Sequence, residues 1–339
     1  MKLPEWVVEH GIGEHRAMLI DGEKVLGAKL HWPGSLNPGR IIETQLISKR
    51  AGSSRGVART GSGVEVLLDN LPQDVTEGAR IHARIKRAPI AERGRLKRAH
   101  GRYEDTRAVE EVHLRGSKPG DTEGISYPMM GVERVRQLPA GQFLDDRWKD
   151  IWHAASSGEV TFDGGALLFS VTPAMTLIDI DGGGSPRELA LAAVPAIARW
   201  LPLFDLGGNI GIDFPTIEAK SDRKAVDSAL EKALDHWPHE RTAMNGFGFV
   251  QIVARLEGPS LLHRFTTSRT GMCARKALHV GELASGTGNV LLLTVHPALK
   301  AKLKPEWIGE LSRRSGRQVE IEVNPALALE APQAQIIAR

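Results

Sequence analysis

The chain has 339 residues, enough for two or three domains of ordinary size. Hydrophobic residues make up 41% of it and charged residues 25%, a composition typical of globular proteins that excludes an intrinsically disordered chain. The net charge of +3 is too small to indicate a partner. The single cysteine, Cys273, excludes an intrachain disulfide and any zinc finger built on several cysteines of one chain.

No membrane or export signal is predicted. Glu5, Glu9 and Glu14 interrupt the N-terminal region where a signal peptide needs an apolar run. The longest uncharged run, residues 164–178, is shorter than the ~20 residues of a spanning helix. We therefore expect a soluble, cytoplasmic protein without a membrane partner.

The first hundred residues have the pattern of β-structure. Short strands between residues 6 and 32 are separated by glycine turns, with a hairpin signal at Asp21–Gly22. After Pro33–Gly34 and Pro38–Gly39, residues 40–86 contain about five short strands, which favours a small barrel of the OB type.

A basic run follows the barrel. Within residues 84–102 only Glu92 is acidic, and the basic residues are Arg84, Lys86, Arg87, Arg93, Arg95, Lys97, Arg98 and Arg102. Such a cluster attracts phosphates whatever the net charge, although a solvated surface or a disordered arm has the same composition. No Phe, Trp or Tyr lies between Trp32 and Tyr103, so RNA bound here would be held by backbone charge with little base stacking.

The second half of the chain has an α/β pattern, after a weakly patterned linker at 104–140. We expect helices at 145–155, 188–201 and 221–237, and strands at 166–170, 175–181, 209–214 and within 245–256. A last module starts at Asn289 as strand, helix and strand. Its helix contains Pro305, which predicts a kink or split, and it ends at Gly316.

Two of the predicted strands end in acids. Asp179 and Asp181 alternate, so their side chains leave the same face, and Asp213 ends the later strand. In an α/β sheet ligands bind at the carboxyl ends of strands, and carboxylates of this kind suit Mg²⁺ or Mn²⁺. If the two strands are neighbours, the three acids form one metal site.

Other interpretations of these residues remain open. Asp181 could be a cap for the helix after the 182–184 glycines. Those glycines could also form a nucleotide-binding turn, although no G-x-G-x-x-G motif is present. Lys224, with Lys220 and Arg223, either lies near a phosphate at the acid site or belongs to the surface.

One block in the second half of the chain resembles the catalytic core of the ribonuclease E/G family. The resemblance covers residues 164–261 and depends on Ile178–Asp179, Asp205–Gly208, Ile212–Phe214, Phe247–Gly248 and Pro259–Leu261. It implies a mixed α/β protein with a DNase I-like catalytic core, an inserted OB-fold barrel and a small C-terminal α/β module. The domains that we predict are 1–35 (β region of an RNase H-like part), 36–102 (OB-fold with basic extension), 103–160 (linker and the rest of the RNase H-like part), 161–262 (catalytic core), 263–288 (degenerate zinc-link segment) and 289–339 (C-terminal module).

The resemblance also implies an activity, namely Mg²⁺-dependent cleavage of single-stranded RNA by an activated water that leaves 5′-phosphate ends. By position Asp179 and Asp213 match the family's metal-binding aspartates, with Mn²⁺ as a possible substitute for Mg²⁺. Asp181 stands where the family has an asparagine that orients water. We expect Arg87, Arg93, Arg95, Lys97, Arg98 and Lys224 to bind the RNA backbone.

The sequence departs from the family in several ways. Cys273 alone stands in place of the paired cysteines that join protomers through zinc, so we expect neither zinc nor a zinc-linked dimer. The segment between barrel and core is short, and Ala254 replaces a 5′-end-binding arginine, with Arg255 next to it. Two other functions stay open, a non-catalytic RNA-binding protein on the same fold and a nucleotide-utilising enzyme built on the glycine turn.

Overall fold

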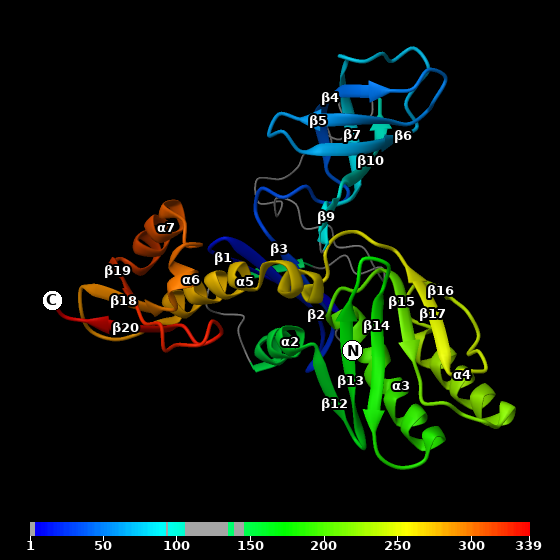
Figure 1. Cartoon of the computed structure of the whole chain (residues 1–339). Coiled ribbons are helices and arrows are strands. Elements are labelled where there is room, and N and C mark those ends of the chain that lie inside the picture. Colours follow the sequence, from blue (N-terminus) through cyan, green and yellow to red (C-terminus); the bar gives the residue numbers. More distant parts are fainter. Residues whose placement is uncertain (1–3, 93, 106–134, 139–145) are drawn as a thin grey trace.

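The computed structural model describes residues 4–92, 94–105, 135–138 and 146–339. Figure 1 shows a β-barrel standing apart from a larger base, and a C-terminal module on the far side of a long helix. The helix is α5 (Leu261–Leu283), which runs from the base to the module.

The N-terminal strands form a four-stranded sheet in the order β11-β1-β2-β3. The bounds are β1 (Glu5–Gly11), β2 (Glu14–Asp21), β3 (Lys24–His31) and β11 (Val135–Leu138). Gly22 has φ +60° in the turn between β2 and β3, as the hairpin signal predicts. Because β11 pairs with β1, the chain returns to this sheet after the barrel.

The barrel is closed by five strands in the order β10-β6-β5-β4-β7. They are β4 (Ile41–Lys49), β5 (Gly56–Thr60), β6 (Glu65–Asp69), β7 (Arg80–Arg87) and β10 (Ala99–Glu104). Its own core contains Leu46, Val66, Leu68 and Ile85. The predicted barrel is therefore confirmed and is consistent with an OB-like fold. A separate hairpin, β8 (Ile90–Glu92) and β9 (Arg95–Lys97), extends from it toward the base.

The base is a six-stranded sheet in the order β12-β13-β14-β15-β17-β16. The strands are β12 (Glu159–Phe162), β13 (Gly165–Val171), β14 (Thr176–Gly182), β15 (Gly208–Asp213), β17 (Phe249–Ala254) and β16 (His239–Arg241). Burial alternates along β14: Thr176, Ile178 and Ile180 are buried, whereas Asp179 and Asp181 are exposed. One face of the sheet therefore packs into the core while the other meets solvent.

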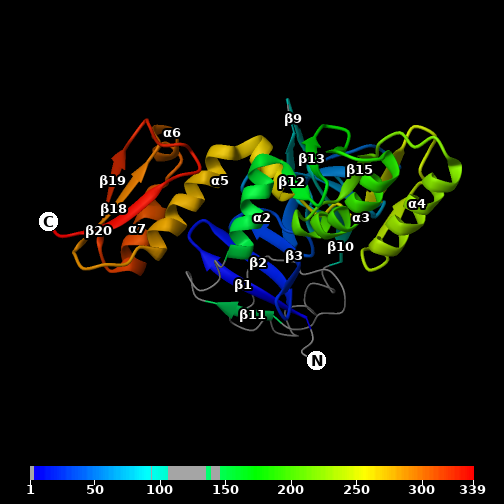
Figure 2. The same cartoon turned by 90° about the horizontal axis from the view of Figure 1, so that it is seen from below.

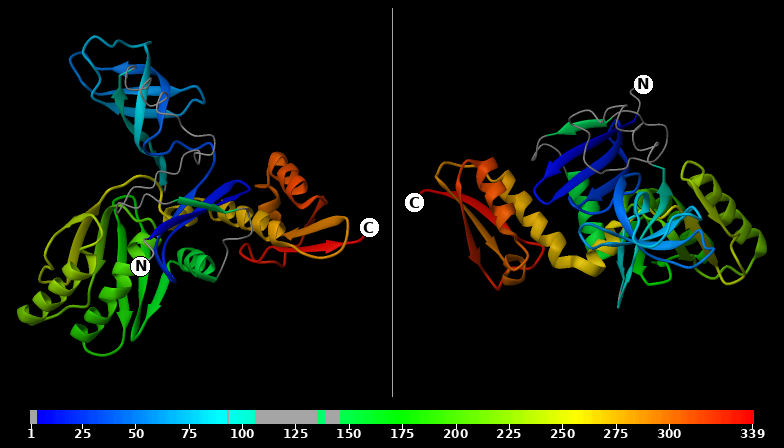
Figure 3. Two further views of the ribbon diagram at one scale, coloured as in Figure 1. Left: turned by 180° about the vertical axis from the view of Figure 1, so that it is seen from behind. Right: turned by 90° about the horizontal axis from the view of Figure 1, so that it is seen from above.

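Three helices accompany this sheet. They are α2 (Asp146–Ser157), α3 (Pro186–Leu203) and α4 (Lys220–Leu234). α3 connects β14 to β15 and buries Ala190, Val194, Ile197 and Leu201 in the largest hydrophobic core. Figures 2 and 3 show α3 and α4 side by side next to the sheet. The acidic face is thus opposite the helices.

The sequence did not reveal α5, which occupies most of the segment assigned to a degenerate zinc link. Ser268 has non-helical dihedral angles (φ −149°, ψ 49°), so the helix is interrupted and its apolar period shifts. Cys273 is completely buried in it, and burial raises the pKa of the thiol to about 11. A thiolate is therefore disfavoured at neutral pH.

The C-terminal module is a three-stranded sheet, β19-β18-β20, packed against α5. Its elements are β18 (Val290–Val295), α6 (Pro297–Lys300), α7 (Pro305–Ser315), β19 (Gln318–Val323) and β20 (Gln333–Ile337). Pro305 splits the predicted helix in two, and Gly316 ends the second part with φ +65°, as expected. β20 was not predicted.

The mixed α/β class is confirmed, whereas the DNase I-like classification of the core remains a prediction. Among the described residues no helix is both long enough and apolar enough to cross a membrane. The strands of the barrel extend two residues beyond the predicted domain end at 102, since Tyr103 and Glu104 belong to β10.

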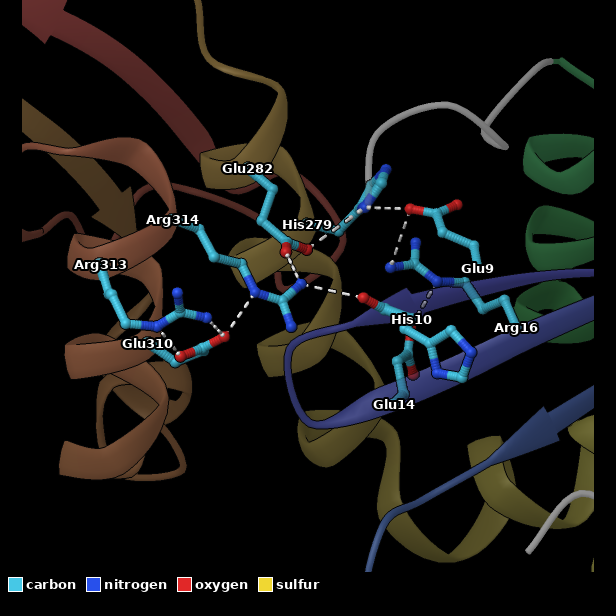
Figure 4. Close-up of polar contacts among 9 residues, drawn as sticks. All are labelled: Glu9, His10, Glu14, Arg16, His279, Glu282, Glu310, Arg313 and Arg314. Carbon is cyan, nitrogen blue, oxygen red and sulfur yellow. Dashed lines mark hydrogen bonds and ion pairs between the residues drawn. The ribbon is translucent and has the colours of Figure 1, made fainter. Parts of the chain in front are cut away.

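A network of charged side chains joins the N-terminal sheet, α5 and the C-terminal module (Figure 4). Glu9, Arg16 and Glu282 are almost completely buried. Nη1 of Arg314 on α7 lies 2.6 Å from Oε1 of Glu282 and donates to the carbonyl oxygen of His10 at 2.9 Å. Because Arg314 contacts both partners, this guanidinium fixes α7 to α5 and β1.

Replacing Arg314 should therefore destabilise the protein. Arg314→Met leaves the Glu282 carboxylate buried without its closest cation, and we expect the free energy of unfolding to fall by about 2 kcal/mol in urea denaturation. Arg313→Met is the matched control, since Arg313 is exposed and its bonds go to Glu310. Equal stability of the two variants would contradict this role of Arg314.

Candidate active site and nucleic-acid interface

The two predicted metal-binding aspartates lie side by side. β14 and β15 are parallel neighbours, and their register makes Asp179 and Asp213 direct partners. Partnered residues of adjacent strands project from the same face, at a strand spacing of about 4.8 Å. The strand periodicity thus aims both exposed carboxylates at the open face of the sheet.

Asp181 lies on the same face, one pleat beyond Asp179, where its backbone partner is Ala166 of β13. It does not cap α3. Ser185 is the N-cap, and its side chain accepts from N of Glu188 while the Glu188 carboxylate accepts from N of Ser185. This capping box satisfies the start of the helix and leaves Asp181 exposed.

The local backbone geometry requires two of the glycines at the end of β14, Gly182 and Gly184. A Cβ at Gly182 would lie 2.4 Å from the carbonyl oxygen of Gly164 and 2.6 Å from Cδ1 of Leu189. Gly184 has φ +91°. Close strand pairing and the turn into α3 therefore account for these two glycines, and the nucleotide-binding interpretation gains no support from them.

The three aspartates have no cation bonded to them in the described part of the chain. Oδ1 of Asp179 accepts from the backbone N of Ile180 at 3.1 Å, and among the described residues no ion pair involves Asp179, Asp181 or Asp213. Mg²⁺ binds through one or two carboxylates and retains several waters, so the Asp179–Asp213 pair fits its donor preference. Among the described residues no group of three or more His, Cys, Asp or Glu side chains is arranged to hold a metal ion.

Next to the aspartates the open face has an apolar floor. A Cβ on Gly211 would lie 2.5 Å from Cζ of Phe249 and 3.0 Å from Cδ2 of Leu177. The absence of a side chain at residue 211 thus lets the Phe249 ring lie across the sheet. Phe249 is also the backbone partner of Asp213 on β17.

The predicted basic residues mostly bind acids or carbonyls within the protein. Arg95 and Lys97 pair with Glu92, Arg98 pairs with Glu65 at 2.9 Å, and Arg87 donates to the carbonyl oxygen of Arg98. Arg95 and Arg98 nevertheless remain more than half exposed. Part of their charge is therefore neutralised by the fold. Arg93 lies outside the described residues.

The β8–β9 hairpin lies near the amino ends of β14 and β15, because Arg95 donates to the carbonyl oxygen of Pro173 at 3.2 Å. Pro173 is in the turn before β14. From Thr176 to Asp179 is three residues, about 10 Å along the strand. Lys224 is exposed on α4, with no ion pair among the described residues.

Three cations of the basic run lie close enough to Arg255 to repel one another where the barrel and the base join, and the sequence did not group Arg255 with them. Burial lowers the pKa of Lys86, and so does repulsion by Arg102, Arg255 and Arg84, whereas the charge of Glu104 opposes this shift. Arg84 and Arg102 share one carboxylate, that of Glu104. Lys86 itself forms no ion pair within the described ranges, and Glu104 acts on it only through its more distant charge. Arg255 comes from the loop after β17, so only the tertiary structure reveals this junction cluster of Arg84, Lys86, Arg102 and Arg255.

Ala254, which stands where the family resemblance places a 5′-end-binding arginine, and Arg255 lie where β17 ends and the following loop begins. Ala254 is buried, whereas Arg255 is 67% exposed and pairs with Glu257 at 3.2 Å. The backbone N of Ala88, at the end of the barrel, donates to the carbonyl oxygen of Glu257 at 2.7 Å. This bond holds the barrel extension against the base.

Residues 148–255 match the family model of the ribonuclease E/G family. The resemblance is confirmed. The matched segment starts in α2 and ends directly after β17, so it contains Asp179, Asp181 and Asp213 together with the helices behind them.

Individual relatives agree with this family match. The chain is 36% identical to ribonuclease G of Escherichia coli strain K12 over 190 residues, which cover 48% of this chain and 39% of the relative. Ribonuclease E of the same strain is 32% identical over 138 residues, or 38% of this chain and 12% of that protein. A chloroplastic ribonuclease E/G-like protein of Arabidopsis thaliana is 34% identical over 84 residues, which are 22% of this chain and 8% of that protein. The chain thus spans much less than two thirds of the relatives it matches.

The paired aspartates predict an effect on stability that is independent of activity. Like charges directly opposite one another in a sheet repel, so Asp213→Asn should raise the free energy of unfolding by about 0.5 kcal/mol in metal-free buffer. Glu240→Gln removes the same charge from the edge strand of this sheet, where the partner is Val253, and should have a smaller effect. A loss of stability in Asp213→Asn would contradict the repulsion.

Proposed function

We propose that the protein is a metal-dependent endoribonuclease that cleaves single-stranded RNA in RNA processing or decay in the cytoplasm. The observation that carries the proposal is the register of β14 and β15, which makes Asp179 and Asp213 neighbours inside the segment that matches the ribonuclease E/G family. Relatives named ribonuclease G and ribonuclease E support the same class of reaction.

Asp179 and Asp213 would hold Mg²⁺, or Mn²⁺ in its place, on the open face. A metal ion bound there lowers the pKa of water and stabilises charge on the phosphate. Asp181, one pleat away, would accept a hydrogen bond from the attacking water and orient it. Attack by water instead of the ribose 2′-hydroxyl would leave 5′-phosphate and 3′-hydroxyl ends.

The junction cluster and the exposed parts of Arg95 and Arg98 would bind RNA phosphates. Ion pairing to Glu92 and Glu65 weakens the second group, so we assign the stronger attraction to Lys86 and its neighbours. With Cys273 buried in α5, we propose neither a zinc link nor a dimer built on one. The alternative, an RNA-binding protein without catalysis, is supported by Asp181 at the family's asparagine position.

Substitution of the aspartates tests the catalytic proposal. Asp179→Asn and Asp213→Asn should each reduce Mg²⁺-dependent cleavage of a 5′-labelled single-stranded RNA by about 100-fold or more, because each removes a charge that holds the ion. Asp181→Asn restores the asparagine expected from the family resemblance and should retain activity. Glu240→Gln, on the edge of the same sheet, controls for the change in net charge.

Two outcomes would decide against catalysis at this site. One is RNA that stays intact with Mg²⁺ and Mn²⁺ while it is bound, which favours the RNA-binding alternative. The other is cleavage by Asp213→Asn at the parental rate. Mg²⁺ should also raise the midpoint of thermal unfolding of the parent and have little effect on Asp213→Asn.

The junction cluster gives a separate prediction for binding. Lys86→Gln should weaken binding of single-stranded RNA and lower the slope of log K against log salt by about 1, as expected for one lost phosphate contact. Lys302→Gln, an exposed lysine of the C-terminal module, should leave both unchanged. Fluorescence anisotropy between 50 and about 300 mM salt measures both quantities. If Lys86→Gln leaves the slope of log K against log salt unchanged, the junction cluster does not contact RNA phosphates.

A further inference from the structure

One aromatic side chain is displayed to solvent beside the aspartates. Phe247, in the loop before β17, is 83% exposed, more than any other large hydrophobic residue of the described chain. Leaving a phenyl ring in water forgoes about 1.5–3 kcal/mol of burial. Single exposed hydrophobic side chains are common on proteins, so what distinguishes Phe247 is its place beside the aspartates, two residues before the partner of Asp213.

Hydrogen bonds within the loop fix the backbone on both sides of Phe247. Oδ1 of Asn245 accepts from the backbone N of Phe247 at 2.9 Å and of Phe249 at 3.0 Å. The N of Asn245 donates to the carbonyl oxygen of Phe249 at 3.1 Å, which closes the turn. The exposure of Phe247 is therefore built into an ordered turn.

The same turn is fixed to the strand that carries Asp213. The N of Phe214 donates to the carbonyl oxygen of Gly248 at 3.2 Å. Gly248 has φ +89°, and a Cβ there would lie 2.5 Å from the carbonyl oxygen of Phe214. Only glycine permits this close approach. Phe247 is thus held at the carboxyl end of β15, one residue before the glycine that contacts the residue following Asp213.

The surroundings indicate what kind of ligand the ring fits. The neighbouring loop residues Thr242, Ala243, Asn245 and Gly246 are exposed and small or polar, so Phe247 is not part of a broad apolar patch of the size that a protein interface needs. A nucleobase needs only one planar face, and stacking on an aromatic ring is the usual way to hold a single-stranded base. Within the barrel the sequence has no Phe, Trp or Tyr before Tyr103 of β10, and the Tyr103 ring is partly buried against the barrel core.

We propose that Phe247 stacks on one base of single-stranded RNA at the carboxyl end of the sheet, next to Asp213. The inference rests on the proposed function and adds a base contact to it. RNA would extend from the cations at the amino ends of β14 and β15, over the floor formed by Gly211 and Phe249, to the Phe247 ring. The RNA would be held by base stacking at the carboxyl end of the sheet and by charge at the amino ends of β14 and β15, with the aspartates between them.

A substitution series at residue 247 tests the stacking. In EDTA, so that no cleavage occurs, Phe247→Ala and Phe247→Leu should each weaken binding of a short single-stranded RNA about 10-fold, whereas Phe247→Trp retains parental affinity. The slope of affinity against salt should stay unchanged, unlike that of Lys86→Gln. An oligonucleotide with 2-aminopurine at successive positions should show quenching at one position that the Leu variant abolishes. Val323→Ala, an exposed apolar residue of β19, is the control.

The outcomes separate this inference from the proposed function. RNA binding that is equal for Phe, Leu and Ala overturns the stacking and leaves the endoribonuclease proposal intact. Equal affinity of Leu and Phe with loss in Ala shows an apolar contact without stacking and also overturns it. Parent protein that binds no RNA removes both proposals. A change in oligomeric state by light scattering in Phe247→Ala, with RNA binding unchanged, assigns the ring to self-association instead.

Discussion

The parallel pairing of β14 with β15 is the constraint on which the candidate site depends. Two parallel neighbours need a crossover connection, and α3 supplies it by leaving β14 after Gly182 and returning to Gly208. The helix buries its apolar stripe against the sheet, and the capping box at Ser185 fixes its start. With the crossover in place, Asp179 and Asp213 become partners. A shift of one residue in the register would turn one of them into the core.

The acids of the candidate site and the basic residues near the barrel differ in how far the protein neutralises them. In the part of the chain that the structure describes, no cation pairs with the aspartates of the open face, while the basic hairpin carries its own acid, Glu92. Arg84 of β7 and Arg102 of β10 share Glu104, and Lys86 forms no ion pair among the described residues. Positive charge that is not neutralised therefore collects at the junction of barrel and base.

Much of the fold follows from local patterns. The alternation of apolar and polar residues predicted β14 and β15, the i, i+4 stripe predicted α4, and Pro305 predicted the break between α6 and α7. The helix α5 was missed because its apolar residues lose their period at Ser268, where the backbone leaves the helical region. β20 was missed as well. Its pairing with β18 is a tertiary contact, which a local pattern does not reveal.

The sequence alone determined that two strands end in aspartates and that Asp179 and Asp181 share a face, because a strand alternates every two residues whatever surrounds it. It also determined that no aromatic residue lies between Trp32 and Tyr103. Only the tertiary structure decided that Asp179 and Asp213 are partners, that Lys86 meets Arg255, and that Phe247 is held in solvent. These are contacts between segments far apart in the chain, and their geometry is set by sheet register and turn bonds.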